Sequence, residues 1–443
     1  MLKRTPISLI VLATAAILGA CSSADPESSP AEATVAPALA IVGATVIDGS
    51  GADPMPDATV VVRGGRIETV GPAGGVEVPA DAEVVDAAGK YVIPGLINAH
   101  GHVGATLGLE GGHYSRGNVL RHLELYASYG VTTVVSLGGD EAAGVEVRDE
   151  QDTPSLDRAR LYVAGAVVTG DTPGAALEMV NGNAAMGVDF IKIRVDDNLG
   201  STRKMTPDVY GAVIERAHEL GLPVAAHLFY LEDAHGLLDA KVDFIVHSVR
   251  DRAVDETLAE RLVEADVCYS PTLTREVSTF VYESEPEFFS DPFFLASAEP
   301  AVLEALRASE SMARYSESES AQRYKEALVQ AQENLGALSD AGVTIAMGTD
   351  TGPPARFQGY FEHMELALMA ESGMSPMEIL VASTGDAARC AGLEGIGTIA
   401  AGSWADLILL TEDPLEGVEN LRAIESVWIA GNEVPSVSAG PQS

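Results

Sequence analysis

The chain has 443 residues, with 65 acidic and 27 basic residues and a formal net charge of −38. Binding to phosphates needs a basic surface, so this charge argues against nucleic acid as a partner and against electrostatic docking on anionic lipid. The length exceeds that of one small domain and fits a large domain with a smaller one appended.

The N-terminus has the features of an export signal. Lys3 and Arg4 precede an apolar run, Ile7 to Ala20, that is too short to span a bilayer comfortably. We therefore predict a signal peptide over residues 1–20. Small residues lead directly into Cys21, as in a bacterial lipobox, so we expect cleavage before this cysteine and lipidation of its thiol. An uncleaved anchor and ordinary signal cleavage are the alternatives.

Residues 21–38 are expected to form the lipidated cysteine and a disordered linker. The stretch Ser22 to Pro37 is rich in Ser, Ala, Pro and Glu and contains no aromatic residue. Ser22 is not the aspartate associated with retention at the inner membrane. We therefore predict an exported protein that is lipid-anchored to a bacterial membrane, the outer membrane facing the periplasm, with no other membrane contact.

The pattern of apolar runs changes at Tyr91. Residues before it form short strand-like runs, including two that flank Gly64-Gly65 and predict a hairpin. From Tyr91 onward, apolar runs of strand length alternate with amphipathic stretches of helix length, which favours a parallel (β/α)8 TIM-like barrel over residues 91–390 and the α/β class. The eight expected strands are Tyr91–Ile97, Val131–Leu137, Leu161–Ala164, Phe190–Val195, Pro223–His227, Phe244–His247, Asp266–Ser270 and Thr344–Gly348.

The segments around these strands give further expectations. Thr206 is expected to cap a helix over Pro207–Leu220, and Thr272 to Asp340 is expected to be an extended loop with helices. The C-terminal runs Gly397–Ile399, Ala405–Leu410 and Ser426–Ala430 are strand-like, and the last meets a Gly-Asn hairpin turn. We expect them to pair with the N-terminal strands, so that residues 39–90 and 391–436 form a small β-sandwich domain built from both ends of the chain.

Two cysteines remain after Cys21. Cys268 lies in a strand-like run and Cys390 in a helix-like run, and we expect both to be buried, unpaired apolar residues. A disulfide between them is the alternative, since oxidising compartments favour one.

Residues able to bind a metal stand at the ends of five of the eight predicted strands. Functional groups of a parallel barrel gather at the C-terminal ends of its strands, and residues two apart in an extended chain point to the same side. A single His or Lys there is more often a packing residue, but the joint pattern predicts a metal site, because imidazole and carboxylate are common metal ligands. The residues are His100, His102, Lys192, His227, His247 and Asp350.

The chain resembles the amidohydrolase superfamily from about Ile41 to Val434. Besides the candidate ligands, the resemblance rests on Val92-Ile93-Pro94-Gly95-Leu96-Ile97-Asn98-Ala99-His100, on residues 186–193 and on residues 397–407. It is similar to the imidazolonepropionase-like and prolidase-like branch, whose members cleave C–N bonds, including those of Xaa-Pro dipeptides.

The resemblance implies two divalent metal ions, most often zinc. His100 and His102 would bind the more buried ion with Asp350, and His227 and His247 would bind the second. A carboxylated Lys192 would bridge the ions, with an unmodified lysine as the alternative. A hydroxide shared by the metals would attack the substrate carbonyl, with Asp350 as general acid and base.

Three residues are candidates for substrate contacts: His113 in the glycine-rich first loop, Tyr230 and Arg194. A flexible loop and a packing aromatic are the alternatives for the first two. Two segments depart from the branch: Val168–Gly174 lacks its histidine, and Val135–Gly139 lacks its Arg-Asp pair. These departures make dipeptidase specificity doubtful and leave another amide, a cyclic amide or an ester open.

The sequence thus predicts an enzyme that hydrolyses a C–N bond of a small substrate, such as a dipeptide or an N-acyl amino acid. The alternatives are an esterase, lactonase or phosphotriesterase on the same metals, or an inactive binding protein. The chain shows no Gly-rich phosphate loop and no Gly-x-Ser-x-Gly elbow. A small-molecule substrate is the expected partner, and a homo-oligomer is left open. Four further histidines are expected in surface or packing roles: His122, His218, His235 and His363.

Overall fold

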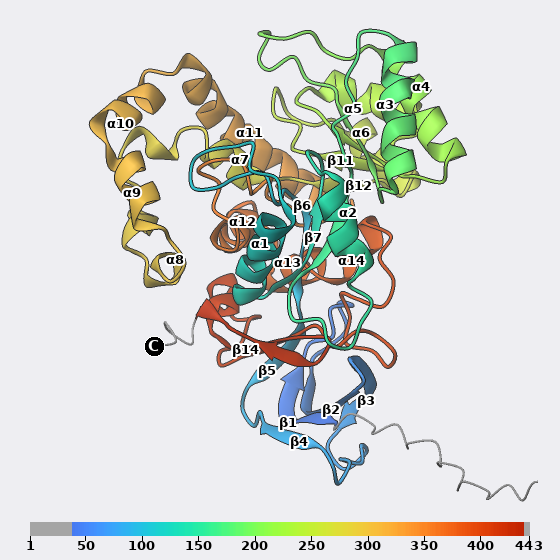
Figure 1. Cartoon of the computed structure of the whole chain (residues 1–443), viewed down its shortest axis with the longest axis vertical. Coiled ribbons are helices and arrows are strands. Elements are labelled where there is room, and N and C mark those ends of the chain that lie inside the picture. Colours follow the sequence, from blue (N-terminus) through green and yellow to red (C-terminus); the bar gives the residue numbers. More distant parts are fainter. Residues whose placement is uncertain (1–37, 438–443) are drawn as a thin grey trace, which may run out of the picture. The chain divides into compact units, whose positions relative to one another are not determined.

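The structure is a computed structural model and describes residues 38–437 (Figure 1). The expected signal peptide, the lipidated Cys21 and the linker up to residue 37 lie outside the described residues. Ala38, which was expected in the linker, is buried, and its carbonyl accepts a hydrogen bond from the Glu83 amide. Within the described range, no helix is long and apolar enough to cross a membrane.

Strands from both ends of the described chain pair in one eight-stranded sheet, in the order β15-β14-β13-β5-β1-β2-β3 with β4 beside β1 (Figure 1). The predicted pairing of the N-terminal and C-terminal strands is therefore present. The hairpin at Gly64-Gly65 is also confirmed, since Arg63 pairs with Arg66. The strands are β1 (Leu39–Val46), β2 (Met55–Arg63), β3 (Arg66–Pro72), β4 (Glu83–Asp86), β5 (Tyr91–Pro94), β13 (Leu407–Leu410), β14 (Ile424–Ile429) and β15 (Asn432–Val434).

Seven parallel strands form two further sheets. The first has the order β6-β7-β8 and the second the order β12-β11-β10-β9, and each pair of neighbours is parallel. Isolated parallel bridges join Val168 to Ile193, Tyr269 to Ile345 and Gly101 to Thr351. The strands are β6 (Leu96–Gly101), β7 (Val131–Ser136), β8 (Arg160–Val163), β9 (Ile191–Arg194), β10 (Val224–His227), β11 (Phe244–Val246) and β12 (Cys268–Ser270). The eighth predicted strand, 344–348, is not assigned as a strand. It bridges to β12 at Ile345, and its Met347 carbonyl accepts a hydrogen bond from the Ala99 amide of β6.

The first predicted strand, Tyr91–Ile97, is wrong as one continuous strand, because the chain changes sheets at Gly95. The Gly95 amide donates to the Asp406 carbonyl, whereas the next amide donates to the Gly130 carbonyl. A Cβ on Gly95 would lie 2.1 Å from the Thr132 hydroxyl oxygen, so a larger residue would clash at this crossing. As a result, β5 belongs to the mixed sheet and β6 to the parallel strands.

Helices separate the parallel strands, as the alternating pattern predicts. Helices also fill the segment after β12, where an extended loop with helices was expected. The helices are α1 (Arg116–Ser128), α2 (Ala142–Asp149), α3 (Pro173–Met186), α4 (Pro207–Glu219), α5 (Leu231–Asp239), α6 (Glu256–Glu264), α7 (Leu273–Val277), α8 (Pro292–Leu295), α9 (Pro300–Arg307), α10 (Ser309–Ser316), α11 (Glu319–Asp340), α12 (Tyr360–Glu371), α13 (Pro376–Ala382) and α14 (Gly385–Cys390), with short 3-10 turns at Val281–Glu283, Glu287–Ser290 and Val418–Arg422.

Two local predictions need correction and one holds. Thr206 precedes α4 as expected, but its hydroxyl donates to the Asp208 carboxylate at 2.5 Å and caps no backbone amide. Residues 397–399 are not a strand; within them, the Ile399 amide donates to the Asp48 carbonyl. The C-terminal hairpin is present, because β14 and β15 are antiparallel, but its turn residues are 430–431 and not the expected Gly431-Asn432, since Asn432 begins β15. Both turn residues have positive φ, as a type I′ hairpin turn requires.

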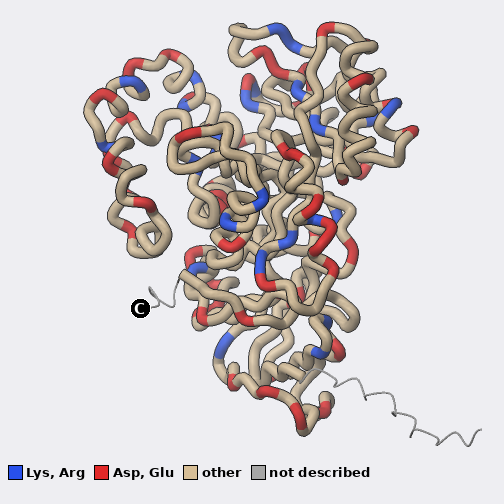
Figure 2. The backbone as a smooth tube through the Cα atoms, viewed as in Figure 1, with Lys and Arg blue, Asp and Glu red and all other residues tan. Residues whose placement is uncertain are grey.

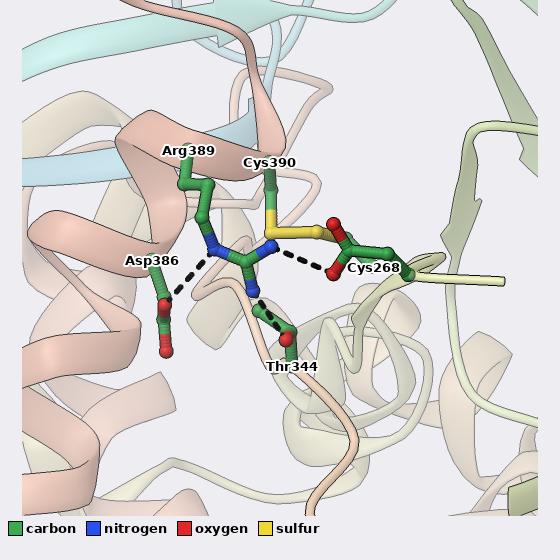
Figure 3. The surroundings of a disulfide bond; sticks show 6 residues. Cys268, Thr344, Asp386, Arg389 and Cys390 are labelled. Atoms are coloured by element: carbon green, nitrogen blue, oxygen red, sulfur yellow. Dashed lines mark hydrogen bonds and ion pairs between the residues drawn. A yellow bond between two sulfur atoms is a disulfide. The ribbon is translucent and has the colours of Figure 1, made fainter. Parts of the chain in front are cut away.

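The prediction of two unpaired cysteines is wrong, because Cys268 and Cys390 form a disulfide (Figure 3). The bond joins the first residue of β12 to the last residue of α14, and their Cα atoms lie 5.7 Å apart. Beside it, Arg389 forms an ion pair with Asp266 at 2.8 Å and a hydrogen bond to the Thr344 hydroxyl. The disulfide therefore fastens the seventh parallel strand to a helix that is distant in the sequence.

Candidate metal centre and substrate cavity

The six residues predicted as metal ligands all line one cavity of about 380 Å³. Three of them lie in strands β6, β9 and β10. Two others directly follow β6 and β11, and Asp350 follows the bridge at Ile345 by five residues. The strand-end pattern therefore brings together side chains that are spread over most of the described chain. The cavity is lined by His100, His102, Leu137, Val167, Thr169, Lys192, Arg194, His227, His247, Arg275, Asp350 and Arg356.

His100, His102 and Asp350 form the tightest group in the cavity. One ligand atom from each lies within 4.8 Å of the others, a spacing that could hold a metal ion. His102 Nε2 lies 2.8 Å from Asp350 Oδ1, and His100 Nε2 lies 3.7 Å from the same oxygen. The backbone also links them, because the Asp350 amide donates to the His100 carbonyl at 2.6 Å.

His227 and His247 form a second pair of candidate ligands. Their ring centroids lie 4.1 Å apart, and the His247 ring lies 4.7 Å from that of His100. Burial lowers the pKa of His227 to about 3 and that of His247 well below its usual value. Both rings are therefore neutral near pH 7, which is the protonation state that binds metals.

Lys192 lies beside His100 of the first group, and its charge also lowers the pKa of His227 and His247. Its Nζ is 3.3 Å from His100 Nε2, and the side chain is buried. Burial lowers the pKa of Lys192 to about 7, because water no longer stabilises the ammonium. Among the described residues, no carboxylate lies within ion-pair distance of this amine. A neutral amine is the form that can react with carbon dioxide to give a carbamate.

The ring nitrogens of the histidines fit metal binding. His102 Nδ1 lies 2.8 Å from the Gly138 carbonyl, His227 Nε2 lies 2.8 Å from Asp196, and His247 Nδ1 lies 2.7 Å from the Thr272 hydroxyl. Ligating histidines commonly bind such a partner through the second nitrogen, which fixes the ring orientation. These contacts leave His102 Nε2, His227 Nδ1 and His247 Nε2 as the nitrogens that can bind a metal. Imidazole nitrogens together with a carboxylate suit zinc.

Asp350 is held in its ionised form. Burial alone would raise its pKa, but Arg356 and the hydrogen bond from His102 bring the pKa well below the usual range. Arg356 Nη1 contacts Asp350 Oδ2 and leaves Oδ1 to the histidines. The carboxylate can therefore act as an anionic ligand and as a base.

Sequence reasoning missed Arg275, Arg356 and Asp196. Arg275 lies in α7, close after β12, and a strand-end search extended by five residues would have found it. Arg356 follows the Asp350 segment in the same way. Asp196 lies just after β9, and the pairing of its buried carboxylate with His227 lowers its pKa. All three residues stand close to strand ends in the sequence. The search for metal ligands did not select them.

The three predicted substrate contacts fall in different places. Arg194 lines the cavity, whereas His113 and Tyr230 are not among the lining residues. The Tyr230 hydroxyl donates to Asp197 at 2.8 Å, and His113 lies 3.7 Å from Glu110. Their roles in substrate binding stay predictions. The four other histidines have surface or packing contacts, with His122 and His363 buried, His218 beside Asp243 and His235 beside Asp255.

Comparison with known proteins gives a match over most of the chain. The model of the Amidohydrolase family matches residues 91–434. An uncharacterised protein of Mycobacterium tuberculosis is 26% identical over 392 residues, which cover 85% of this chain and 93% of that protein. An imidazolonepropionase of Streptomyces griseus is 23% identical over 409 residues, covering 85% of this chain and 92% of that enzyme. The solved structure of a candidate prolidase from Bifidobacterium longum has a TM-score of 0.73 and 26% identity, and the match covers 92% of this chain and 97% of that one.

Proposed function

Because the chain belongs to the amidohydrolase family, we propose that this metal-dependent hydrolase cleaves an amide or peptide-like C–N bond of a small substrate. A dipeptide and an N-acyl amino acid are the substrates we favour. The observation that carries the proposal is the convergence of all six candidate ligands on one cavity. The similarity to a candidate prolidase and to an imidazolonepropionase supports C–N bond cleavage.

The residues take the following roles in this proposal. His100, His102 and Asp350 would hold one divalent ion, His227 and His247 the second, and Lys192, once carboxylated, would lie between them. When bound, such ions, most readily zinc, polarise a carbonyl and make water acidic near neutral pH. Asp350 takes the proton of the attacking water and delivers it to the leaving amine. The ion pair with Arg356 keeps its carboxylate ready for the first of these transfers.

Metal analysis and a substrate screen test the proposal. We expect two equivalents of zinc or a similar ion per chain after incubation with metal and bicarbonate. The screen would compare dipeptides, N-acyl amino acids, lactones and phosphotriesters. Turnover of a compound with an amide bond supports the proposal. A chain that binds fewer than about one ion, or one that cleaves only esters or phosphotriesters, would contradict it.

Three arginine side chains at the cavity lead us to favour a substrate with an anionic group. Acidic residues are spread along the described chain (Figure 2), yet Arg194, Arg275 and Arg356 line this cavity. Guanidinium groups bind carboxylates with two parallel hydrogen bonds. Each arginine already has an acidic partner: Asp196 for Arg194, Asp350 for Arg356, and Glu276 at 2.9 Å for Arg275. Arg275 is buried and also packs 4.3 Å above the Tyr324 ring, so it is held in place before substrate binds.

Replacing Arg275 by Ala should raise the KM for a carboxylate-bearing substrate by about 10- to 100-fold and change kcat less, because a hydrogen bond to a charged group contributes about 1.5–3 kcal/mol. Steady-state kinetics would measure both constants. Arg252→Ala, which removes an exposed arginine outside the cavity, serves as the control. If the KM for the matching uncharged amide rises equally, Arg275 does not recognise the anion.

We also propose that the protein is exported and lipid-anchored through Cys21 at the outer membrane, facing the periplasm. The disulfide supports export, since such bonds persist in oxidising compartments. The isolated bridges support closure of the parallel strands into an eight-stranded barrel over residues 91–390. The mixed sheet would then form the small sandwich domain from residues 39–90 and 391–436, with β5 added to it. The homo-oligomer stays a prediction.

A further inference from the structure

Helix α12 carries two buried carboxyl groups, Glu362 and Glu365, whose hydrogen bonds reach segments that carry or contact candidate metal ligands. Both are 0% exposed, and neither forms an ion pair with any described Lys, Arg or His. Burial raises the pKa of both carboxyl groups, to about 8 for Glu365. Burying a carboxyl group without a cation is costly, and the cost is offset only by well-placed hydrogen-bond donors. The hydrogen-bond donors to Glu362 and Glu365 come from segments that carry or contact candidate metal ligands.

Glu362 accepts hydrogen bonds from β6, from the segment around Asp350 and from its own helix terminus. Its Oε1 accepts from Asn98 Nδ2 at 2.7 Å and from the hydroxyl groups of Thr349 and Thr351 at 2.7 and 2.6 Å. Its Oε2 accepts from the Gly359 amide at 2.6 Å. One carboxylate thus ties β6 to the segment around Asp350.

The donors to Glu362 adjoin two candidate metal ligands. Asn98 Oδ1 accepts a hydrogen bond from the His100 amide at 3.0 Å, and Thr349 and Thr351 stand on either side of Asp350. The φ angle of Asp350 is +57°, a left-handed conformation that residues other than glycine adopt only infrequently. The hydroxyl groups on both sides fix the backbone of Asp350 in this conformation.

Glu365 holds the other half of the site in the same way. It accepts from the amides of Leu273 and Thr274 at 2.6 and 2.7 Å and from the Thr274 hydroxyl at 2.7 Å. The residue before them, Thr272, also has a positive φ of +49°, and its hydroxyl contacts His247 Nδ1. Glu365 therefore fixes the turn that orients the His247 ring.

We propose that Glu362 and Glu365 are positioning residues, each of which sets the geometry of one half of the metal centre. Glu362 places His100 and Asp350, and Glu365 places His247 through Thr272. The inference rests on the proposed function in one respect, namely that these residues are metal ligands. Neither glutamate is among the residues that line the cavity, so each acts through its neighbours.

Metal titration of Glu362→Gln and Glu365→Gln in the full chain tests the inference. Cobalt absorption reports ligand geometry, and calorimetry with zinc reports affinity. We expect each variant to lower the affinity for one of the two zinc ions by about 10- to 100-fold, the loss typical of residues that orient ligands. Glu378→Gln is the matched control, because Glu378 accepts from the Ser375 amide at the start of α13, outside the cavity, and metal binding should be unchanged.

Repeating both substitutions in a His102→Ala variant shows which half of the site each loss of metal affinity comes from. His102→Ala should leave mainly the ion held by His227 and His247. In that background, Glu365→Gln should still weaken binding, whereas Glu362→Gln should not. The reverse pattern, or equal losses from both substitutions, would overturn the assignment.

A hydroxyl swap keeps the inference testable if a glutamate variant does not fold. Thr351→Val removes the hydroxyl at nearly constant shape and should reproduce the Glu362→Gln loss, while Thr351→Ser should restore wild-type cobalt absorption. Unchanged affinity in folded Glu362→Gln or in Thr351→Val would overturn the inference and leave the proposed function standing if the wild type binds two equivalents. A wild-type chain that binds no metal would overturn both, and an equal loss in Glu378→Gln would show a general stability effect instead.

Discussion

Replacing Asp350 by Asn should lower kcat by about 10²- to 10⁴-fold, the range that general acid–base catalysis contributes. Asparagine has nearly the same shape, but its amide cannot take a proton from water or deliver one to a leaving amine. Because Arg356 and His102 keep the pKa of Asp350 well below its usual range, the native carboxylate is ionised throughout the neutral range. Steady-state kinetics on the best amide from the screen would measure the loss.

The control for this experiment is Asp53→Asn, which makes the same chemical change at an exposed position. It should leave kcat unchanged. Circular dichroism and thermal unfolding should show that both variants keep the fold. Wild-type turnover in Asp350→Asn would refute the role of this residue as acid and base.

Removing the disulfide should lower the free energy of unfolding by about 5 kcal/mol. The bond closes a loop with a sequence separation of 122 residues, and cross-links over loops of this length restrict the unfolded chain most strongly. Urea unfolding of the Cys268→Ala, Cys390→Ala double variant would measure the change. The same loss should appear when the wild type is unfolded in reductant.

The double variant also serves as the control for other effects of the reductant. Because it lacks the disulfide, its free energy of unfolding should be the same with and without reductant. A thiol assay would verify that the wild-type disulfide has been reduced. An unchanged unfolding midpoint in fully reduced wild type would contradict the prediction and would show that Arg389 and its neighbours hold β12 and α14 together without the bond.

The candidate metal centre could be predicted because each of its residues has a local signal. A short apolar run followed by His or Asp marks a strand and its functional end, and parallel strands bring such ends together. Each residue alone, such as His227 or Asp350, is a weak candidate, and the prediction came from finding such residues at five of the eight strand ends. The expected hairpins followed from turn residues in the same way, as at Gly431.

Features that depend on distant partners could not be predicted. The apolar run from Tyr91 to Ile97 is continuous in the sequence, and only the pairing of its first half with β1 and β13 places that half in another sheet. The pairing of Cys268 with Cys390 depends on the path of all the chain between them. Arg275 was missed because a guanidinium is not a metal ligand, although it lies in the same cavity.

The position of β5 has a consequence for the order of folding. One edge of β5 pairs with β1 and the other with β13, which comes nearly a whole domain later in the chain. Until residues 407–410 are available, β5 has an unpaired edge, and such edges invite pairing with other chains. Pairings this distant also form slowly. We therefore expect the parallel strands to assemble first and the mixed sheet to close last, when the C-terminal strands reach it.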